Sequence, residues 1–176
     1  HRTPNGHPFE ISPTRTDEAC DAERLEEYER RWDKGGLRFR GAFQNLLMSK
    51  EANDTAADFL KAKIRGVVND PETADKLANI DHPYGAKRPP IDTTYFETYN
   101  RDNVSLVDVK SAPITGFTET GVKTSDREFD IDVLVMATGF DAVTGALSRI
   151  DITGIDGKKL QDKWRNGPTT AFGFMV

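Results

Sequence analysis

The sequence is short of several features that define large classes of proteins. Its single cysteine, Cys20, excludes an internal disulfide, and its three histidines lack the spacing of metal ligands, so we expect no metal site. No segment approaches the roughly 18 consecutive apolar residues of a membrane span, and no signal peptide opens the chain. These absences predict a soluble, cytoplasmic protein that has no membrane partner.

Positive charge is also scarce. The 176 residues include 24 lysines and arginines against 29 aspartates and glutamates, a net charge of −5, and the basic residues form no long run. A nucleic-acid-binding protein would be expected to carry a basic face, so we expect no nucleic-acid partner. The phosphate-binding motif Gly-x-Gly-x-x-Gly is missing as well, so the chain has no glycine-rich loop of that kind to hold a dinucleotide.

What the sequence does contain is a short apolar run, residues 133–136 (VLVM), that ends in three small residues, Ala137, Thr138 and Gly139. An unbroken apolar run suits a strand buried on both faces of a parallel sheet, and ligands bind at the carboxyl edge of such sheets. Gly139 has no β-carbon, so a cofactor could approach its backbone closely. The alternative is a buried strand followed by an ordinary turn.

The first half of the chain has helical periodicity. Thr16 is the predicted N-cap of a first helix, and Gly35-Gly36 is expected to end it. Apolar residues between positions 56 and 68 recur at helical spacing, and Asp70-Pro71 is typical of an N-cap followed by the first residue of a further helix. The aromatic residues of this part are interpreted as core rather than as a cofactor pocket.

A change of pattern follows at residues 82–90 (HPYGAKRPP). The adjacent cations Lys87 and Arg88 precede two prolines that restrict the backbone. A solvated loop with two surface charges is one interpretation, and a loop that holds an arginine rigidly is the other. Further on, residues 104–109 are predicted to form a strand, and residues 114–131 a small antiparallel meander.

Several motifs, in this order, resemble those of the Baeyer–Villiger monooxygenases: residues 86–89 (AKRP), 95–104 (YFETYNRDNV), 137–147 (ATGFDAVTGAL) and 163–168 (KWRNGP). The resemblance implies an α/β fold, part of a flavoprotein with two Rossmann-like dinucleotide-binding domains, one for FAD and one for NADPH, and a helical insertion. It assigns residues 1–12 to the end of an NADPH-domain segment and 13–82 to a helical subdomain. In residues 83–139 the chain would return to the NADPH domain and form its β-meander. Residues 140–176 would be the start of the segment in which the chain returns to the FAD domain.

The resemblance also implies an activity and a set of site residues. Enzymes of this family insert one oxygen atom of O2 into a ketone, giving an ester or lactone, and they use FAD and NADPH. By resemblance, Arg2, Thr3 and Lys87 contact the 2′-phosphate of NADPH, and Arg88 lies beside the flavin as the catalytic cation. The segment at the junction of the two domains would meet the cofactors through Ala137, Thr138, Gly139 and Phe140.

The sequence departs from the family because both glycine-rich motifs and the fingerprint with histidine and tryptophan are absent. We therefore expect an internal piece of a longer monooxygenase, inactive by itself. Two alternatives stay open. One is an N-hydroxylating or sulfur-oxidising flavin monooxygenase, which shares the architecture but not the Lys87-Arg88 pair. The other is a non-catalytic fragment whose helices serve as an interaction module.

Overall fold

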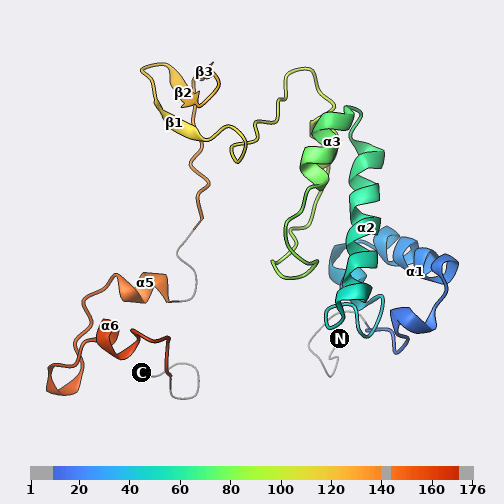
Figure 1. Cartoon of the computed structure of the whole chain (residues 1–176), viewed down its shortest axis with the longest axis horizontal. Helices are drawn as coiled ribbons and strands as arrows, with labels where there is room; N and C mark the ends of the chain where they lie inside the picture. Colours follow the sequence, from blue (N-terminus) through green and yellow to red (C-terminus); the bar gives the residue numbers. More distant parts are fainter. Residues whose placement is uncertain (1–9, 140–143, 171–176) are drawn as a thin grey trace. The chain divides into compact units, whose positions relative to one another are not determined.

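The computed structural model describes residues 10–139 and 144–170 (Figure 1). The described residues divide into two compact units, 10–115 with 124–126, and 116–123 with 127–139 and 144–170. The first unit contains the long helices, and the second contains short helical turns and strand segments. Within the described residues, no helix is both long and apolar enough to cross a membrane.

The first long helix, α1 (Asp21–Asp33), follows a short 3-10 turn, η1 (Thr16–Glu18). The prediction that Thr16 caps this helix is wrong: Thr16 is buried, and its backbone N–H donates to Oδ1 of Asn45 at 3.0 Å. The helix begins instead after Cys20, whose N–H donates to the carboxylate of Glu23 at 2.8 Å. That hydrogen bond holds the pKa of Glu23 below its usual value. Thr16 therefore lies in η1, before α1 begins, and its hydroxyl donates to Oδ1 of Asn45 at 3.3 Å instead of accepting from the first turn of α1.

The predicted end of this helix at two glycines is confirmed. Gly35 and Gly36 have φ of 65° and 63°, a left-handed conformation that residues with a β-carbon rarely adopt. The chain then turns into the 3-10 helix η2 (Gly36–Gly41).

The second long helix, α2 (Lys50–Val67), is the longest element of the described residues and is the predicted helix around residues 56–68. Its N-cap is Ser49, whose hydroxyl accepts a hydrogen bond from the N–H of Ala52. The next helix, α3 (Pro71–Ala78), begins as predicted, because the carboxylate of Asp70 accepts from the N–H of Thr73 at 2.8 Å. The short α4 (Tyr95–Thr98) follows the loop that carries Lys87 and Arg88.

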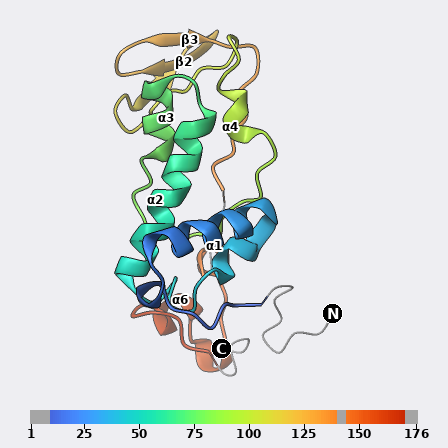
Figure 2. The same cartoon turned by 90° about the vertical axis from the view of Figure 1, so that its right-hand side faces the viewer.

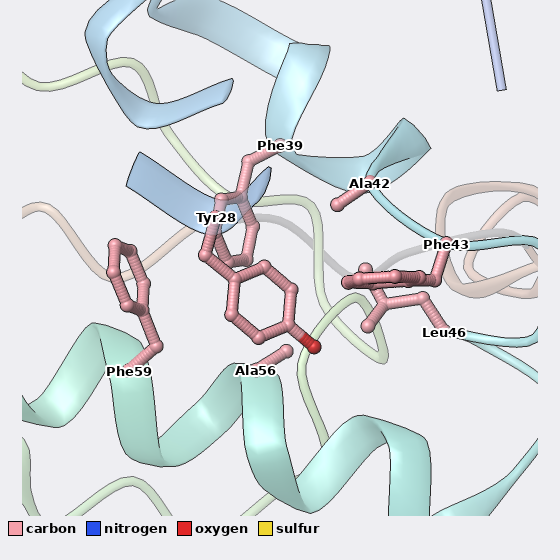
Figure 3. Packing of buried hydrophobic residues seen from close by; sticks show 7 residues of the cluster. All are labelled: Tyr28, Phe39, Ala42, Phe43, Leu46, Ala56 and Phe59. Atoms are coloured by element: carbon pink, nitrogen blue, oxygen red, sulfur yellow. The ribbon is translucent and has the colours of Figure 1, made fainter. Parts of the chain in front are cut away.

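Two apolar clusters hold this unit together. The larger lies between α1, η2, the turns after it and α2, and it is mainly aromatic (Figure 3); its members are Tyr28, Phe39, Ala42, Phe43, Leu46, Ala56 and Phe59. The smaller joins α2 to α3 and is flanked by α4; its buried members are Ile64, Val68, Ala74 and Ala78. Seen from the side in Figure 2, α1 crosses the lower half of α2. The aromatic residues thus form core, as the sequence predicts.

A small three-stranded sheet has the order β1-β2-β3, formed by β1 (Ile114–Phe117), β2 (Gly121–Thr124) and β3 (Glu128–Asp130). Strands β2 and β3 are antiparallel, and Val122 lies opposite Phe129. This agrees with the predicted meander. The strand predicted over residues 104–109 is not formed, and these residues have no regular secondary structure.

After the sheet, the described part of the second unit contains α5 (Gly145–Ser148), the 3-10 turn η3 (Ile155–Gly157) and α6 (Leu160–Lys163). An antiparallel bridge between Thr153 and Lys159 closes the loop around η3. Asp156 and Gly157 both have positive φ, 60° and 72°, as a tight turn requires, and Leu160 is buried.

Candidate functional site

The candidate site in the first unit is the Lys-Arg segment, residues 82–90, which leaves α3 and approaches the start of α2. A turn opens it: the N–H of Ala86 donates to the carbonyl of Pro83 at 3.1 Å. Gly85, the third residue of the turn, has φ of 81°, which is typical of a type II turn with glycine at that position. Glycine is therefore required here by the backbone conformation.

Tyr84 attaches this turn to the helical core. Its ring packs edge-on against Phe39, with 5.4 Å between ring centroids and 89° between planes. Its backbone N–H donates to Oδ1 of Asn53 at 2.8 Å, and its carbonyl accepts from Nδ2 of the same residue at 2.9 Å. Burial of the ring raises the pKa of Tyr84 to about 12. Both the side chain and the backbone of Tyr84 are thus fixed.

Lys87 and Arg88 are exposed and follow directly after this anchored turn. In the described part of the chain, neither side chain forms a hydrogen bond or an ion pair. The nearby Asp81 pairs instead with Lys110, whose Nζ lies 2.7 Å from Oδ2 of Asp81. The hydrogen bond and charge of Lys110, together with the charge of Lys87, lower the pKa of Asp81. The two adjacent cations are therefore available to an anionic ligand.

The second unit contains the other sequence-predicted site residues that the structure describes: Ala137, Thr138 and Gly139. The buried strand predicted before them is wrong for the described chain. Residues 133–136 have no regular structure, and Val133 and Val135 are 77% and 79% exposed. A parallel strand needs neighbouring strands to complete its backbone hydrogen bonds, and the described residues place none beside it.

Gly139 retains the property that made it a candidate. Its φ is 76°, and a β-carbon added there would meet no atom within 4 Å. The backbone at this point is therefore open to close approach by a ligand, as a flavin or a nicotinamide would require. Arg2, Thr3 and Phe140 lie outside the described residues, so of the predicted phosphate contacts only Lys87 has a described position.

Three residues that support the Lys-Arg segment were not predicted as site residues: Asn53, Gly85 and Asp81. Asn53 had a detectable signal, because asparagine is a poor helix former and this one occupies the apolar stripe of α2, three residues before Ala56 and seven before Leu60. Gly85 could have been found from its position in a proline- and glycine-containing turn. The pairing of Asp81 with Lys110 joins residues that are 29 positions apart, and no local pattern announces it.

A second candidate, an open cavity of about 480 Å³ beside α1, has a structural explanation. Its two arginines already have a partner: Arg30 and Arg31 both donate to the carboxylate of Glu27, at 2.6 and 2.7 Å. Burial opposes ionisation of Glu27, but these hydrogen bonds outweigh it and lower its pKa. Among the residues described, no three histidine, cysteine or acidic side chains are grouped so that they could hold a metal ion.

Comparison with known proteins gives a consistent result. The chain is 46% identical, over 99% of its length, to the 2-oxo-Δ3-4,5,5-trimethylcyclopentenylacetyl-CoA monooxygenase of Pseudomonas putida. It is 42% identical over 95% of its length to a Baeyer–Villiger monooxygenase of Pseudooceanicola batsensis, and 42% identical over 94% to a phenazine N-monooxygenase of Lysobacter antibioticus. No protein-family model matches the chain.

The fold comparison agrees. A crystal structure of the monooxygenase OTEMO in complex with FAD and NADP superposes with a TM-score of 0.92 at 46% identity, covering 97% of this chain. This chain spans only 33% of that protein, and 32% of the Pseudomonas relative. The chain is thus a relative of one segment, about a third in length, of the Baeyer–Villiger monooxygenases.

Proposed function

We propose that the complete protein containing this chain is a Baeyer–Villiger monooxygenase that inserts one oxygen atom from O2 into a small-molecule ketone to give an ester or lactone. The likeness to a monooxygenase solved with FAD and NADP, over nearly the whole of this chain, carries the proposal. We further propose the finer architecture: a flavoprotein with two Rossmann-like dinucleotide-binding domains, in which residues 13–82 form a helical subdomain inserted in the NADPH domain.

The residues present fit the two cofactors. A phosphate dianion requires cations that are not already neutralised, and Lys87 offers one on an anchored segment. A flavin or nicotinamide ring requires close access to backbone, and Gly139 leaves that space open. We assign Lys87, with Arg2 and Thr3, to the 2′-phosphate of NADPH, and Ala137, Thr138, Gly139 and Phe140 to the cofactor junction.

Bound FAD would supply the oxygen chemistry and NADPH the electrons. The chain's own contribution is position and charge. Arg88 would act as the catalytic cation, because a guanidinium stays protonated in a folded protein. It can therefore stabilise negative charge that develops on a reacting oxygen without surrendering a proton to it.

A second activity has a specific observation in its favour. One relative of comparable identity is named a phenazine N-monooxygenase, so oxidation at a nitrogen atom is the competing proposal. The two reactions differ in product: ketone insertion gives an ester or lactone, and attack on an aromatic nitrogen gives an N-oxide.

The test is direct. The complete enzyme is purified, its bound flavin is measured, and it is incubated with NADPH, isotope-labelled O2 and either a cyclic ketone or phenazine. We expect one labelled oxygen in a lactone and no N-oxide. Labelled N-oxide without lactone would replace the proposal by its competitor, and a colourless protein that binds neither cofactor would support the non-catalytic helical module.

A further inference from the structure

We propose that Asn53 is a positioning residue for Lys87 and Arg88: its carboxamide fixes the backbone of the Lys-Arg segment and so determines where the two cations are presented. The consequence for coenzyme binding rests on the proposed function. The structural half of the inference, that Asn53 orders this segment, is independent of it.

The side chain of Asn53 makes three hydrogen bonds, all of them to nearby backbone. It is 7% exposed, and Nδ2 donates to the carbonyls of Tyr84 at 2.9 Å and Leu46 at 3.1 Å, while Oδ1 accepts from the N–H of Tyr84 at 2.8 Å. A carboxamide has two donor hydrogens, and both are used. Because both backbone groups of Tyr84 bind the same side chain, the orientation of the chain at this residue is determined.

The turn after Tyr84 transmits that orientation to the cations. A β-carbon added at Gly85 would lie 2.7 Å from Cδ2 of Leu47, so the turn packs directly against the segment that leads into α2. Lys87 and Arg88 come immediately after the turn, and Pro89 restricts the backbone on their other side.

A second asparagine fastens the far end of the same stretch. Asn100, after α4, donates through Nδ2 to the carbonyl of Val67 at 2.8 Å and accepts through Oδ1 from the N–H of Asn69 at 2.8 Å. Val67 is the last residue of α2, and Asn53 lies near its first turn. Residues 84–100 are therefore attached to α2 near both of its ends.

This attachment uses backbone contacts and leaves the cations free. Within residues 10–139 and 144–170, no carboxylate forms an ion pair with Lys87 or Arg88. A segment held by ion pairs to its own cations would have to break them before it bound an anion. Anchoring through Asn53 avoids that competition, which is why we assign Asn53 a role in presenting the charges rather than only in stabilising α2.

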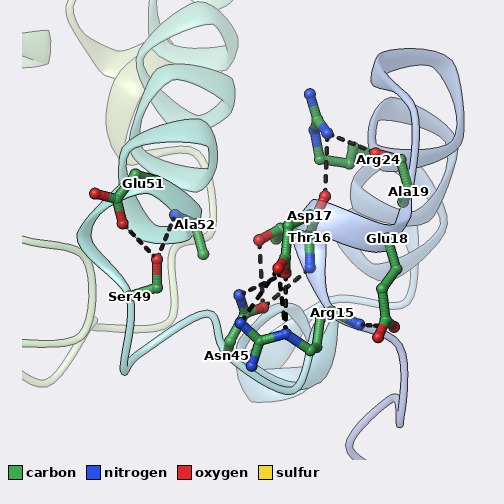
Figure 4. Close-up of polar contacts among 10 residues, drawn as sticks. All are labelled: Arg15, Thr16, Asp17, Glu18, Ala19, Arg24, Asn45, Ser49, Glu51 and Ala52. Carbon is green, nitrogen blue, oxygen red and sulfur yellow. Dashed lines mark hydrogen bonds and ion pairs between the residues drawn. The ribbon is translucent and has the colours of Figure 1, made fainter.

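Asn45 provides a matched control. It is 5% exposed, similar to Asn53, and its carboxamide bonds Thr16 at 3.0 and 3.3 Å and Asp17 at 3.3 Å (Figure 4). None of these partners belongs to the Lys-Arg segment. Asn53→Ala and Asn45→Ala therefore each remove a buried carboxamide from the same unit, but only Asn53→Ala releases Tyr84.

The experiment measures amide hydrogen exchange of peptide 82–90 and the Michaelis constants for NADPH and NADH in the complete enzyme. In Asn53→Ala we expect exchange at Tyr84 and Ala86 to accelerate by about tenfold or more, as loss of a hydrogen bond to a buried group implies. The preference for NADPH over NADH should fall about tenfold, toward that of Lys87→Ala. Asn45→Ala should change neither quantity, even where it lowers the melting temperature equally.

Gly85→Ala is the second variant, because it displaces the turn without touching Asn53 and tests the inference even if Asn53→Ala fails to fold. Unchanged exchange in peptide 82–90 in the foldable variants would overturn the inference. A second result would also overturn it: faster exchange in Asn53→Ala or Gly85→Ala with the preference for NADPH unchanged, although Lys87→Ala abolishes that preference. If Lys87→Ala itself leaves the preference intact, the coenzyme role of Lys87 fails, and exchange still decides whether Asn53 orders the segment.

Discussion

Asp81 is paired with Lys110, with 2.7 Å between Oδ2 and Nζ, although Lys87 also lies close enough to lower the pKa of the same carboxylate. The carboxylate next to the Lys-Arg segment is therefore already occupied. This relationship explains how an acidic chain, with a net charge of −5, keeps Lys87 free for an anionic ligand.

Lys87→Ala should raise the Michaelis constant for NADPH much more than that for NADH, because only NADPH carries the 2′-phosphate. Loss of a hydrogen bond to a charged group is worth roughly 1.5–3 kcal/mol, which is about ten- to a hundredfold in affinity. Lys50→Ala is the control, since Lys50 is exposed and pairs with Asp54 on α2. An equal effect of Lys87→Ala on both coenzymes would remove the 2′-phosphate assignment.

Lys110→Ala should weaken NADPH binding even though we assign Lys110 no contact with the coenzyme. Its removal frees Asp81 to attract Lys87, and the phosphate must then compete with that carboxylate. We expect a rise of about two- to fivefold in the Michaelis constant for NADPH, since an exposed ion pair is worth up to about 1 kcal/mol. The double variant Lys110→Ala/Asp81→Asn should restore the original value; if it does not, Asp81 is not the competitor.

Local sequence predicted those elements whose determinants are local. The start of α3 at Asp70-Pro71 and the glycines that end α1 depend on residues within one turn, and both were predicted correctly. The prediction of Thr16 as the N-cap of α1 was wrong because Thr16 lies in η1 and its hydroxyl donates to Asn45, 29 residues away. The strand predicted at residues 133–136 failed for a related reason, since a strand needs partners that the described chain does not supply.

The same distinction applies to the candidate site. The two prolines suggested that the chain around Lys87 and Arg88 is restrained, which stays a prediction, and the resemblance named both cations. The residue that anchors the segment, Asn53, precedes Tyr84 by 31 positions and belongs to another element. Its contribution depends on a tertiary contact, and the spacing of residues within the segment cannot predict a partner in another helix.

The ionisation of Tyr84 should destabilise the protein at alkaline pH. Burial raises its pKa from 10.0 to about 12, so the neutral phenol is favoured in the folded state. Its stabilising contribution is therefore complete below pH 10 and is lost as the pH rises through about 12. Tyr84→Phe should keep the packing on Phe39. Between pH 10 and pH 12 its melting temperature should fall less than that of the wild type. Parallel curves for the two proteins across that range would contradict this assignment.

Gly139→Val should reduce flavin retention in the complete enzyme. Valine is strained at a φ of 76°, and its branched side chain would also fill the open space beside the backbone. Gly139→Asn separates the two causes, because asparagine tolerates the left-handed conformation but still obstructs approach. The flavin-to-protein absorbance ratio measures the loss. Gly154→Ala is the control, as its added β-carbon meets only Lys158 O at an ordinary 3.7 Å. Full flavin content in both Gly139 variants would show that no cofactor approaches this residue.

Arg88 should be required for product formation and dispensable for folding. It is exposed and makes no hydrogen bond or ion pair with any described residue, so Arg88→Ala removes no stabilising contact that the structure records. We therefore expect an unchanged melting temperature and flavin content, with ester or lactone formation reduced by about a hundredfold or more, as is typical when a group that stabilises developing charge is removed.

Arg88→Lys should be nearly as damaging, because a flexible ammonium does not reproduce the planar arrangement of guanidinium donors. The wild type should couple NADPH oxidation to product, whereas both variants should continue to oxidise NADPH and release hydrogen peroxide. Product, peroxide and NADPH are therefore measured together. Arg38→Ala is the control, since Arg38 is exposed and, among the described residues, donates only to the carbonyls of Lys34 and Gly35. If Arg88→Ala forms product at a rate near that of the wild type, Arg88 is a surface charge, and the solvated-loop interpretation of residues 82–90 is correct.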